Sequence, residues 1–328
     1  MRGEGQGPEV PDPPPNQLFQ LPPNERPRVA VLLGPTAVGK TAVALALARE
    51  LKAEIVNADS LQVYRALNIG TAKPTLNERA LIPHHLVDVV DPDEPYHAAR
   101  YSREGRAVLS QLHQRGVPPL VVGGTGLYLK ALLYGLFEDG SPQGLIRDRL
   151  RQEFAALGLT PLYHRLRYLD PLAAARLNPH DTYRILRALE VMEATGQPVS
   201  ALQAGHRFKD CPYEVLKLGL ALPREELYRR IDLRVEVMLK AGWLEEVRDL
   251  VKRYPPDLKP LKALGYRHLI AFLAGRWTWE EAITLLKRDT RRYAKRQLTW
   301  FRADPEVRWF EPTQIAAMRA CLGEFFGR

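Results

Sequence analysis

The sequence predicts an α/β fold: a P-loop NTPase-like parallel sheet core with an inserted all-helical domain and a helical C-terminal region. Short apolar runs alternate with helical segments from Arg28 to Val122, which is typical of right-handed βαβ units. A helical pattern then fills residues 140–211, and an apolar run at Glu214–Leu222 returns to the sheet. We therefore assign residues 28–139 and 212–328 to the core and residues 140–211 to the insertion.

The first strand, Arg28–Leu33, leads into the run GPTAVGKT and an Ala/Leu-rich helix that ends at Leu51. A glycine loop between a strand and a helix directs backbone N–H groups and a helix N-terminus at phosphate oxygens. Lys40 adds a positive charge, and the Thr41 hydroxyl can ligate Mg²⁺. The predicted phosphate-binding residues are Gly34, Pro35, Thr36, Ala37, Val38, Gly39, Lys40 and Thr41.

The second strand, Glu54–Asp59, ends in a carboxylate, and His85–Val90 is predicted as the third strand. Because ligands bind at the carboxyl ends of parallel strands, we expect Asp59 on the same edge as the phosphate loop. A carboxylate there can ligate Mg²⁺ through water or accept a proton from an attacking nucleophile. An N-cap for the following helix is an equally good interpretation of Asp59.

A helix over Ala98–Arg115 stops at Gly116, and the next strand, Leu120–Val122, enters the run Gly123-Gly124-Thr125-Gly126. Thr125 can donate a hydrogen bond to an anionic or amine group. The alternative is a plain turn between a strand and a helix. This strand does not end in the aspartate that ATPases of this class often carry, which argues against a hydrolysis motor.

Proline at the first helical position marks two helix starts in the insertion, after Thr160 and after Asp170. Asp181 is predicted to cap a helix that ends before Gly196. Beyond Pro223 only helices are predicted. The first carries Leu227, Ile231, Val235 and Met238 on one face and is followed by Gly242 as its C-cap and a helix over Trp243–Arg253.

The last long helix begins with a capping box of Thr278 and Glu281 and carries a basic stripe. An isolated stripe of this kind is usually a solvated helix face. The net charge of +9 makes a phosphate backbone the better interpretation. The stripe comprises Arg288, Arg291, Arg292, Lys295 and Arg302, and the insertion adds Arg147, Arg149, Arg151, Arg184 and Arg187.

Composition argues against several classes of protein: membrane-spanning, secreted, disulfide-bonded and zinc-binding. No apolar stretch is long enough for a bilayer span, and the N-terminus lacks the apolar segment of a secretory signal. Only Cys211 and Cys321 are present, which makes a disulfide framework or zinc cluster improbable and a reducing cytoplasm the default. His84 and His85 lack a metal-binding context. Residues 1–27 are proline-rich and are predicted to form a flexible tail.

The phosphate loop, Asp59 and Thr125 together resemble one family, the tRNA dimethylallyltransferases or isopentenyltransferases. Further matching segments occur in the order that the family shows, over nearly the whole chain from residue 28 onward. They are ADSLQVYRALNIGTAKP (58–74), PHHLVDVVDP (83–92), LVVGGTGLYLKALLYGL (120–136), RALEV (187–191), KALGYRHL (262–269) and TRRYAKRQLTWFR (290–302).

The resemblance implies transfer of a dimethylallyl group from dimethylallyl diphosphate to the N6 amine of the adenosine 3′ to the anticodon in tRNA. By similarity, Asp59 accepts the N6 proton, Thr125 is the active-site threonine, and Arg234 contacts the diphosphate. The glycine loop with Lys40 and Mg²⁺ would hold this diphosphate as the leaving group. We expect a cytoplasmic, monomeric enzyme. The resemblance and the basic stripe together predict tRNA contacts at Asp59, Ser60, Leu61, Gln62, Thr125, Arg147, Tyr183, Arg184, Ile185, Leu186, Arg187, Arg288, Arg292 and Lys295.

Two other functions suit parts of the sequence. A small-molecule kinase that uses ATP would also need a phosphate loop and a strand-end aspartate. A non-catalytic RNA-binding protein could retain a nucleotide loop. Within the prenyltransferase hypothesis, a free mononucleotide acceptor is a variant that the basic insertion argues against, because so small an acceptor does not need that surface.

Overall fold

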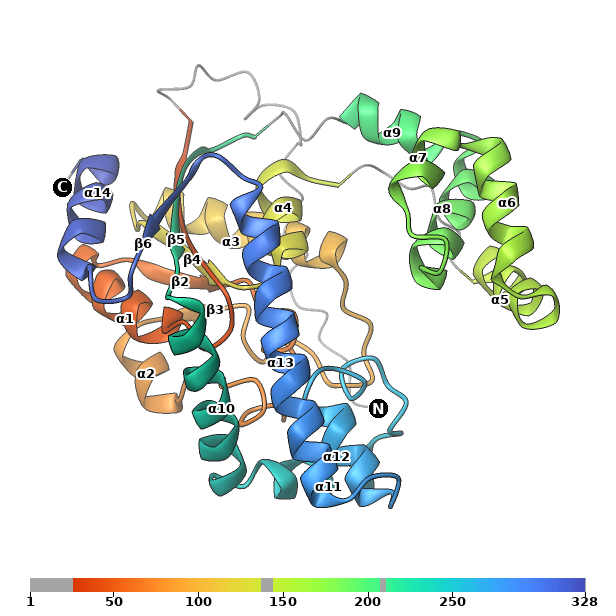
Figure 1. The fold of residues 1–328 in the computed structure, drawn as a ribbon. Helices are drawn as coiled ribbons and strands as arrows, with labels where there is room; N and C mark the ends of the chain where they lie inside the picture. Colours follow the sequence, from red (N-terminus) through yellow and green to blue (C-terminus); the bar gives the residue numbers. More distant parts are fainter. Residues whose placement is uncertain (1–25, 137–143, 207–210, 328) are drawn as a thin grey trace, which may run out of the picture. The chain divides into compact units, whose positions relative to one another are not determined.

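The computed structural model describes residues 26–136, 144–206 and 211–327. Its centre is a six-stranded sheet of order β3-β2-β4-β1-β5-β6 in which every neighbouring pair is parallel (Figure 1). The α/β class with a parallel sheet is therefore confirmed. The strands are β1 (Arg28–Leu33), β2 (Glu54–Asn57), β3 (His84–His85), β4 (Pro119–Gly123), β5 (Glu214–Leu220) and β6 (Val307–Phe310).

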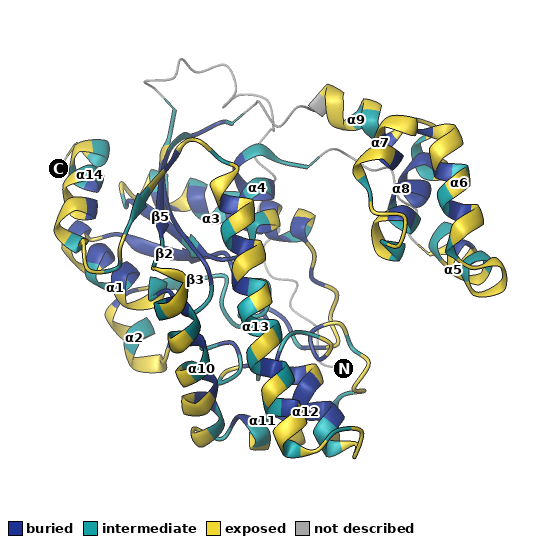
Figure 2. Cartoon of the chain, in the orientation of Figure 1, coloured by how far each residue is buried: buried dark blue, intermediate teal, exposed yellow. Residues whose placement is uncertain are grey.

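Helices cover both faces of this sheet. The chain crosses from β1 to β2 in one direction and, after β3, from β3 back to β4 in the other, so right-handed connections place α1 and α3 on opposite faces. Burial on both faces explains why β1 is a nearly continuous apolar run, and Figure 2 shows the central strands as largely buried. The helices are α1 (Lys40–Leu51), α2 (Leu76–Leu81), α3 (Ala98–Gln114), α4 (Gly126–Tyr134), α10 (Arg224–Lys240), α11 (Trp243–Arg253), α12 (Tyr266–Leu273), α13 (Trp279–Arg302) and α14 (Ile315–Phe326).

Each face has its own packing. Leu47 of α1 shares a buried cluster with Met318 and Leu322 of α14. On the α3 side, the ring of Tyr101 stacks on Tyr128 of α4 with centroids 4.2 Å apart. Within the described ranges, no helix combines the length and apolar content that a membrane span requires.

The chain divides into two compact units, one of Met1–Leu133 with Cys211–Arg328 and one of Tyr134–Asp210. The second unit contains only helices among its described residues and has an apolar core of its own. Asp170 and Asp181 cap α7 and α8 as predicted, through bonds from Ala173 N and Arg184 N. The helices are α5 (Leu145–Leu157), α6 (Leu159–Leu169), α7 (Pro171–Arg176), α8 (Thr182–Thr195) and α9 (Val199–His206).

Five details of the predicted elements are wrong. The second strand ends at Asn57 rather than at Asp59. The third strand is only His84–His85, because Leu86 and Asp88 adopt positive φ values of 60° and 57° that end it. The chain beyond Pro223 is not all helical, because β6 adds a parallel edge strand beside β5. Helix α6 begins at residue 159 rather than after Thr160, and Gly242 is the N-cap of α11 rather than a C-cap. Of the predicted tail, residues 1–25 lie outside the described residues.

Candidate active site

The phosphate loop joins β1 to α1, and its own lysine holds it. Lys40 Nζ donates hydrogen bonds to the carbonyl oxygens of Gly34, at 3.0 Å, and Pro35, at 2.8 Å. Gly39, the N-cap of α1, has a φ of 105°, which favours glycine. The first N–H groups of a helix have no partner within the helix, so the start of α1 suits phosphate oxygens.

A cavity of about 60 Å³ opens beside this loop at the carboxyl edge of the sheet. Its wall combines Lys40 and Thr41 of α1 with Asp59 and Gln62, which follow β2, and Gly123 at the end of β4. The sequence predicted one shared edge for these strand ends, and the structure brings their residues into one cavity.

Asp59 is held in place through one of its two carboxylate oxygens. Oδ1 accepts hydrogen bonds from the N–H groups of Leu61, at 2.9 Å, and Gln62, at 3.4 Å. Asn57 Oδ1 accepts from the N–H of Asp59 at 3.1 Å. No helix begins here, since α2 has Thr75 as its N-cap, so Asp59 is not a helix cap. Among the residues that the structure describes, Oδ2 receives no hydrogen bond and is open to a ligand.

The turn after β4 is hydrogen-bonded to the turn after β2. Thr125 N donates to Ala58 O at 3.2 Å, and Thr125 Oγ1 accepts from the N–H of Ser60 at 3.1 Å. Gly123 makes this approach possible, because a Cβ at that position would lie 2.2 Å from Ala58 O. Thr125 is therefore fixed beside the segment that carries Asp59.

The Asp59 carboxylate interacts electrostatically with two half-buried cations. Burial and the nearby Arg234 guanidinium lower the pKa of Lys40 to about 8, although the Asp59 carboxylate opposes the shift. Burial also lowers the pKa of Arg234, again against the effect of Asp59. Desolvated cations of this kind gain a favourable interaction when an anionic ligand arrives. Arg234 of α10 is therefore coupled electrostatically to Lys40 and Asp59, and its contact with a diphosphate stays a prediction.

Comparison with known proteins identifies the family. A profile described as IPP transferase matches residues 62–304, and one described as isopentenyl transferase matches residues 27–82. The chain belongs to the IPP transferase family. The predicted resemblance is confirmed, and so is its prediction of a transferase enzyme, whereas the kinase hypothesis is not favoured.

Three relatives of this IPP transferase illustrate the similarity. The tRNA dimethylallyltransferase of Syntrophobacter fumaroxidans is 54% identical over 284 residues, which cover 86% of this chain and 83% of the relative. The crystal structure of a full-length tRNA isopentenylpyrophosphate transferase from Bacillus halodurans has 36% identity and a TM-score of 0.70, over 92% of this chain and 97% of its own. The structure of a eukaryotic dimethylallyltransferase acting on tRNA has 29% identity and a TM-score of 0.80, over 92% of this chain and 80% of its own.

In the helical unit of this IPP transferase, the predicted RNA-contacting residues differ in exposure. Tyr183 is 79% exposed, and Arg184 is exposed and pairs with Asp181 of the same unit. Arg147 and Arg187 both pair with Glu190, which is buried. Ile185 is fully buried and the partly buried Leu186 packs against the same core, because α8 turns its apolar stripe inward; RNA contact at these two positions stays a prediction.

On α13 the basic stripe is partly neutralised. Asp289 pairs with Arg288 at 3.0 Å, Arg267 at 2.8 Å and Arg292 at 3.7 Å. Arg291 does not belong to a free stripe, because its guanidinium is 2.7 Å from a carboxylate oxygen of Asp232 on α10. Arg288, Arg292 and Lys295 are exposed, and Figure 2 shows exposed segments of α13 in yellow.

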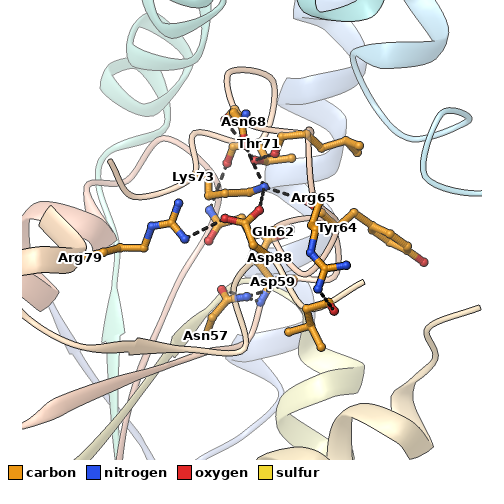
Figure 3. A network of polar contacts seen from close by, with 12 residues as sticks. Asn57, Asp59, Gln62, Tyr64, Arg65, Asn68, Thr71, Lys73, Arg79 and Asp88 are labelled. Atoms are coloured by element: carbon orange, nitrogen blue, oxygen red, sulfur yellow. Dashed lines mark hydrogen bonds and ion pairs between the residues drawn. The ribbon is translucent and has the colours of Figure 1, made fainter. Parts of the chain in front are cut away.

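A polar network behind Asp59 was not predicted (Figure 3). Lys73, with 2% of its side chain exposed, uses all three N–H donors: Nζ lies 2.7 Å from Tyr64 O, 2.9 Å from Asn68 Oδ1 and 2.5 Å from Asp88 Oδ1. Asp88 also accepts from Arg79 at 2.7 Å. Burial alone would raise the pKa of Asp88, but Lys73 and Arg79 outweigh it and lower that pKa.

The same segment is anchored from a distant helix. Glu246 of α11 accepts hydrogen bonds from the backbone N–H groups of Asn68, at 2.9 Å, Ile69, at 2.7 Å, and Gly70, at 3.2 Å, and from the hydroxyl of Tyr266 at 2.8 Å. These polar contacts, rather than regular secondary structure, order the chain that follows Asp59.

We expect Lys73→Met to lower the free energy of unfolding by about 3 kcal/mol at neutral pH, because removing one partner of a buried ion pair leaves the other charge uncompensated. Urea unfolding monitored by circular dichroism measures this change. The matched control is Lys262→Met, since Lys262 is exposed, and it should stay within about 0.5 kcal/mol of the parent chain. Equal stability of the two variants would contradict a structural role for Lys73.

Proposed function

We propose that this IPP transferase moves a dimethylallyl group from dimethylallyl diphosphate to the N6 amine of the adenosine 3′ to the anticodon in tRNA. The observation that carries the proposal is the shared cavity of Lys40, Thr41 and Asp59, which sets a phosphate-binding loop beside an open carboxylate oxygen. Family membership and the names of the relatives support the choice of substrates.

The residues suit a displacement at the allylic carbon. A bond forms between N6 and that carbon while the bond from the carbon to the diphosphate oxygen breaks. The N6 proton passes to Asp59, whose Oδ2 is open while Oδ1 stays bonded to the turn. Lys40 and Arg234 neutralise the charge that develops on the departing diphosphate, and burial strengthens this effect.

The site fits Mg²⁺. No group of three histidine, cysteine or carboxylate side chains suited to a metal occurs among the described residues, so the protein offers no closed metal cage. Mg²⁺ commonly takes few protein ligands and uses substrate phosphates and water for the rest. Thr41 would hold the ion through its hydroxyl, and when bound the ion would neutralise diphosphate charge. Lys40 would then orient the diphosphate from the loop side.

The proposed acceptor is a base in an RNA loop, which must leave its stack to reach a buried site. The exposed cations of α13 and the exposed Tyr183 and Arg184 of the helical unit support contact with an RNA backbone and bases. We propose the cytoplasm as the site of action and a monomer as the working form.

Incubation with labelled dimethylallyl diphosphate and unmodified tRNA tests this function. We expect label in tRNA; nucleoside mass analysis should identify a prenylated adenosine, and mass analysis of nuclease fragments should place it beside the anticodon. Parallel reactions replace tRNA with AMP, or replace the donor with labelled ATP and a metabolite mixture. Label in AMP alone, or phosphate transfer without prenylation, would refute the proposal.

We expect kcat/KM for dimethylallyl diphosphate to fall as the pH rises above about 8. Lys40 is charged below its pKa of about 8 and loses its charge as the pH passes that value, and kcat/KM reports the free enzyme. Saturating kcat should change less, because bound diphosphate favours the charged lysine. In the Lys40→Arg variant the decrease of kcat/KM at high pH should disappear, since arginine stays protonated. If the variant has the same pH profile as the parent, the decrease comes from another group.

A further inference from the structure

Gln297 connects the two halves of the active site. It lies on α13, is 7% exposed, and its side-chain amide makes two hydrogen bonds to distant segments. Oε1 accepts from the N–H of Thr36 in the phosphate loop at 2.9 Å. Nε2 donates to the carbonyl oxygen of Gly124, in the turn that carries Thr125, at 2.8 Å.

The turn after β4 is shaped to receive α13. A Cβ on Gly124 would lie 2.4 Å from Gln297 Nε2, and a Cβ on Gly126 would lie 2.3 Å from Trp300 Nε1. Residues 297 and 300 are three apart and so lie on one face of the helix. The glycines on both sides of Thr125 therefore allow α13 to pack closely against this turn.

The two segments serve opposite sides of the proposed reaction. The phosphate loop faces the diphosphate, whereas Thr125 is hydrogen-bonded to Ser60, next to the proton acceptor Asp59. Within the described ranges, no backbone hydrogen bond joins residues 34–41 to residues 124–126, and Gln297 is the one side chain bonded to both. The amide of glutamine offers one acceptor and one donor at a fixed separation, which matches the two backbone groups it meets.

We propose that Gln297 is a positioning residue that fixes the distance between the phosphate loop and the Thr125 turn, and so between the donor carbon and the acceptor amine. This inference rests on the proposed function. Each substrate keeps its own contacts when Gln297 is changed, so binding should persist while the rate of transfer falls. A displacement of about 1 Å between reacting groups can reduce a rate about a hundredfold.

The test compares single-turnover transfer in three variants with the parent enzyme, using labelled dimethylallyl diphosphate and enzyme in saturating excess over tRNA. In this regime the rate constant does not depend on the folded fraction. Gln297→Met keeps the side-chain length without either hydrogen bond, and we expect its rate constant to fall about 30-fold. Gln297→Asn keeps the amide but is one methylene too short to reach both loops, and we expect a fall of about tenfold.

The matched control is Thr299→Ala, since the exposed Thr299 bonds only to its own helix, and it should react within twofold of the parent. Dissociation constants for tRNA and for the donor, measured separately, should change less than about threefold in every variant. If Gln297→Met does not fold, Gln297→Asn carries the test. A parental rate constant in a folded Gln297 variant, or a loss confined to binding, would overturn the proposal, whereas a parent that does not prenylate tRNA would overturn the proposed function instead.

Discussion

Asp59→Asn is expected to reduce kcat for tRNA prenylation about a thousandfold. Asparagine retains an Oδ1 that can accept the hydrogen bonds from Leu61 and Gln62, so the turn should persist. The other position of the side chain becomes an NH₂ group, which cannot accept the N6 proton. The measurement is the initial rate of label incorporation at saturating substrates, with RNA affinity from filter binding or fluorescence anisotropy.

Asp93→Asn is the matched control, because Asp93 is exposed and lies outside the cavity. It should retain the parental rate. Asp59→Asn should also retain RNA affinity within about threefold, since the carboxylate is one of many contacts to a large ligand. A parental rate in Asp59→Asn would assign proton acceptance to another group, and a rate loss caused only by weaker RNA binding would make Asp59 a binding residue.

The second large effect is expected for Lys40→Met, with kcat/KM for dimethylallyl diphosphate lower by about a thousandfold. Two losses combine: the buried charge that faces the diphosphate, and the hydrogen bonds from Nζ to Gly34 O and Pro35 O that hold the loop. Preorganised cations at a developing negative charge typically contribute about 10²–10³ in rate. Steady-state kinetics with varied donor at saturating tRNA measures the change.

Lys52→Met supplies the control for Lys40→Met, because Lys52 follows the same helix but is exposed. We expect its donor kinetics to match the parent. If Lys40→Met raised KM for tRNA while leaving the donor parameters intact, the loop would contact the acceptor rather than the diphosphate.

Local patterns predicted most of the core. The strand–loop–helix unit around Lys40, the helix over Ala98–Gln114 and the capping box at Thr278 follow from apolar runs, glycine positions and caps that act over a few residues. The predicted third strand was too long because apolar residues continue through Leu86, Val87, Val89 and Val90, whereas the backbone turns away at Leu86 and Asp88, which have positive φ. The edge strand β6 has only four residues, too few for a periodic signal.

The sequence predicted active-site residues only where they belong to a recognisable motif. Asp59 and Thr125 lie at strand ends, so topology and family resemblance both pointed to them. Lys73 and Gln297 lie within matching segments but, like Glu246, showed no sign of a particular role, since a lone polar residue in a helical or loop pattern is usually solvated. Their roles depend on partners that no local pattern identifies: Gln297 lies 261 residues from Thr36 along the chain.

The anchoring of the segment at Asn68–Gly70 by Glu246 has a consequence for how the enzyme is made. The bonded groups are 176 to 178 residues apart, and β1 pairs with β5 across a similar interval. A nascent chain that has emerged only as far as α4 therefore possesses the phosphate loop and Asp59 but lacks the contacts that Glu246 makes to residues 68–70 and that Gln297 makes to Thr36 and Gly124. We expect the catalytic centre to reach its final geometry late in synthesis, after α11 and α13 have left the ribosome.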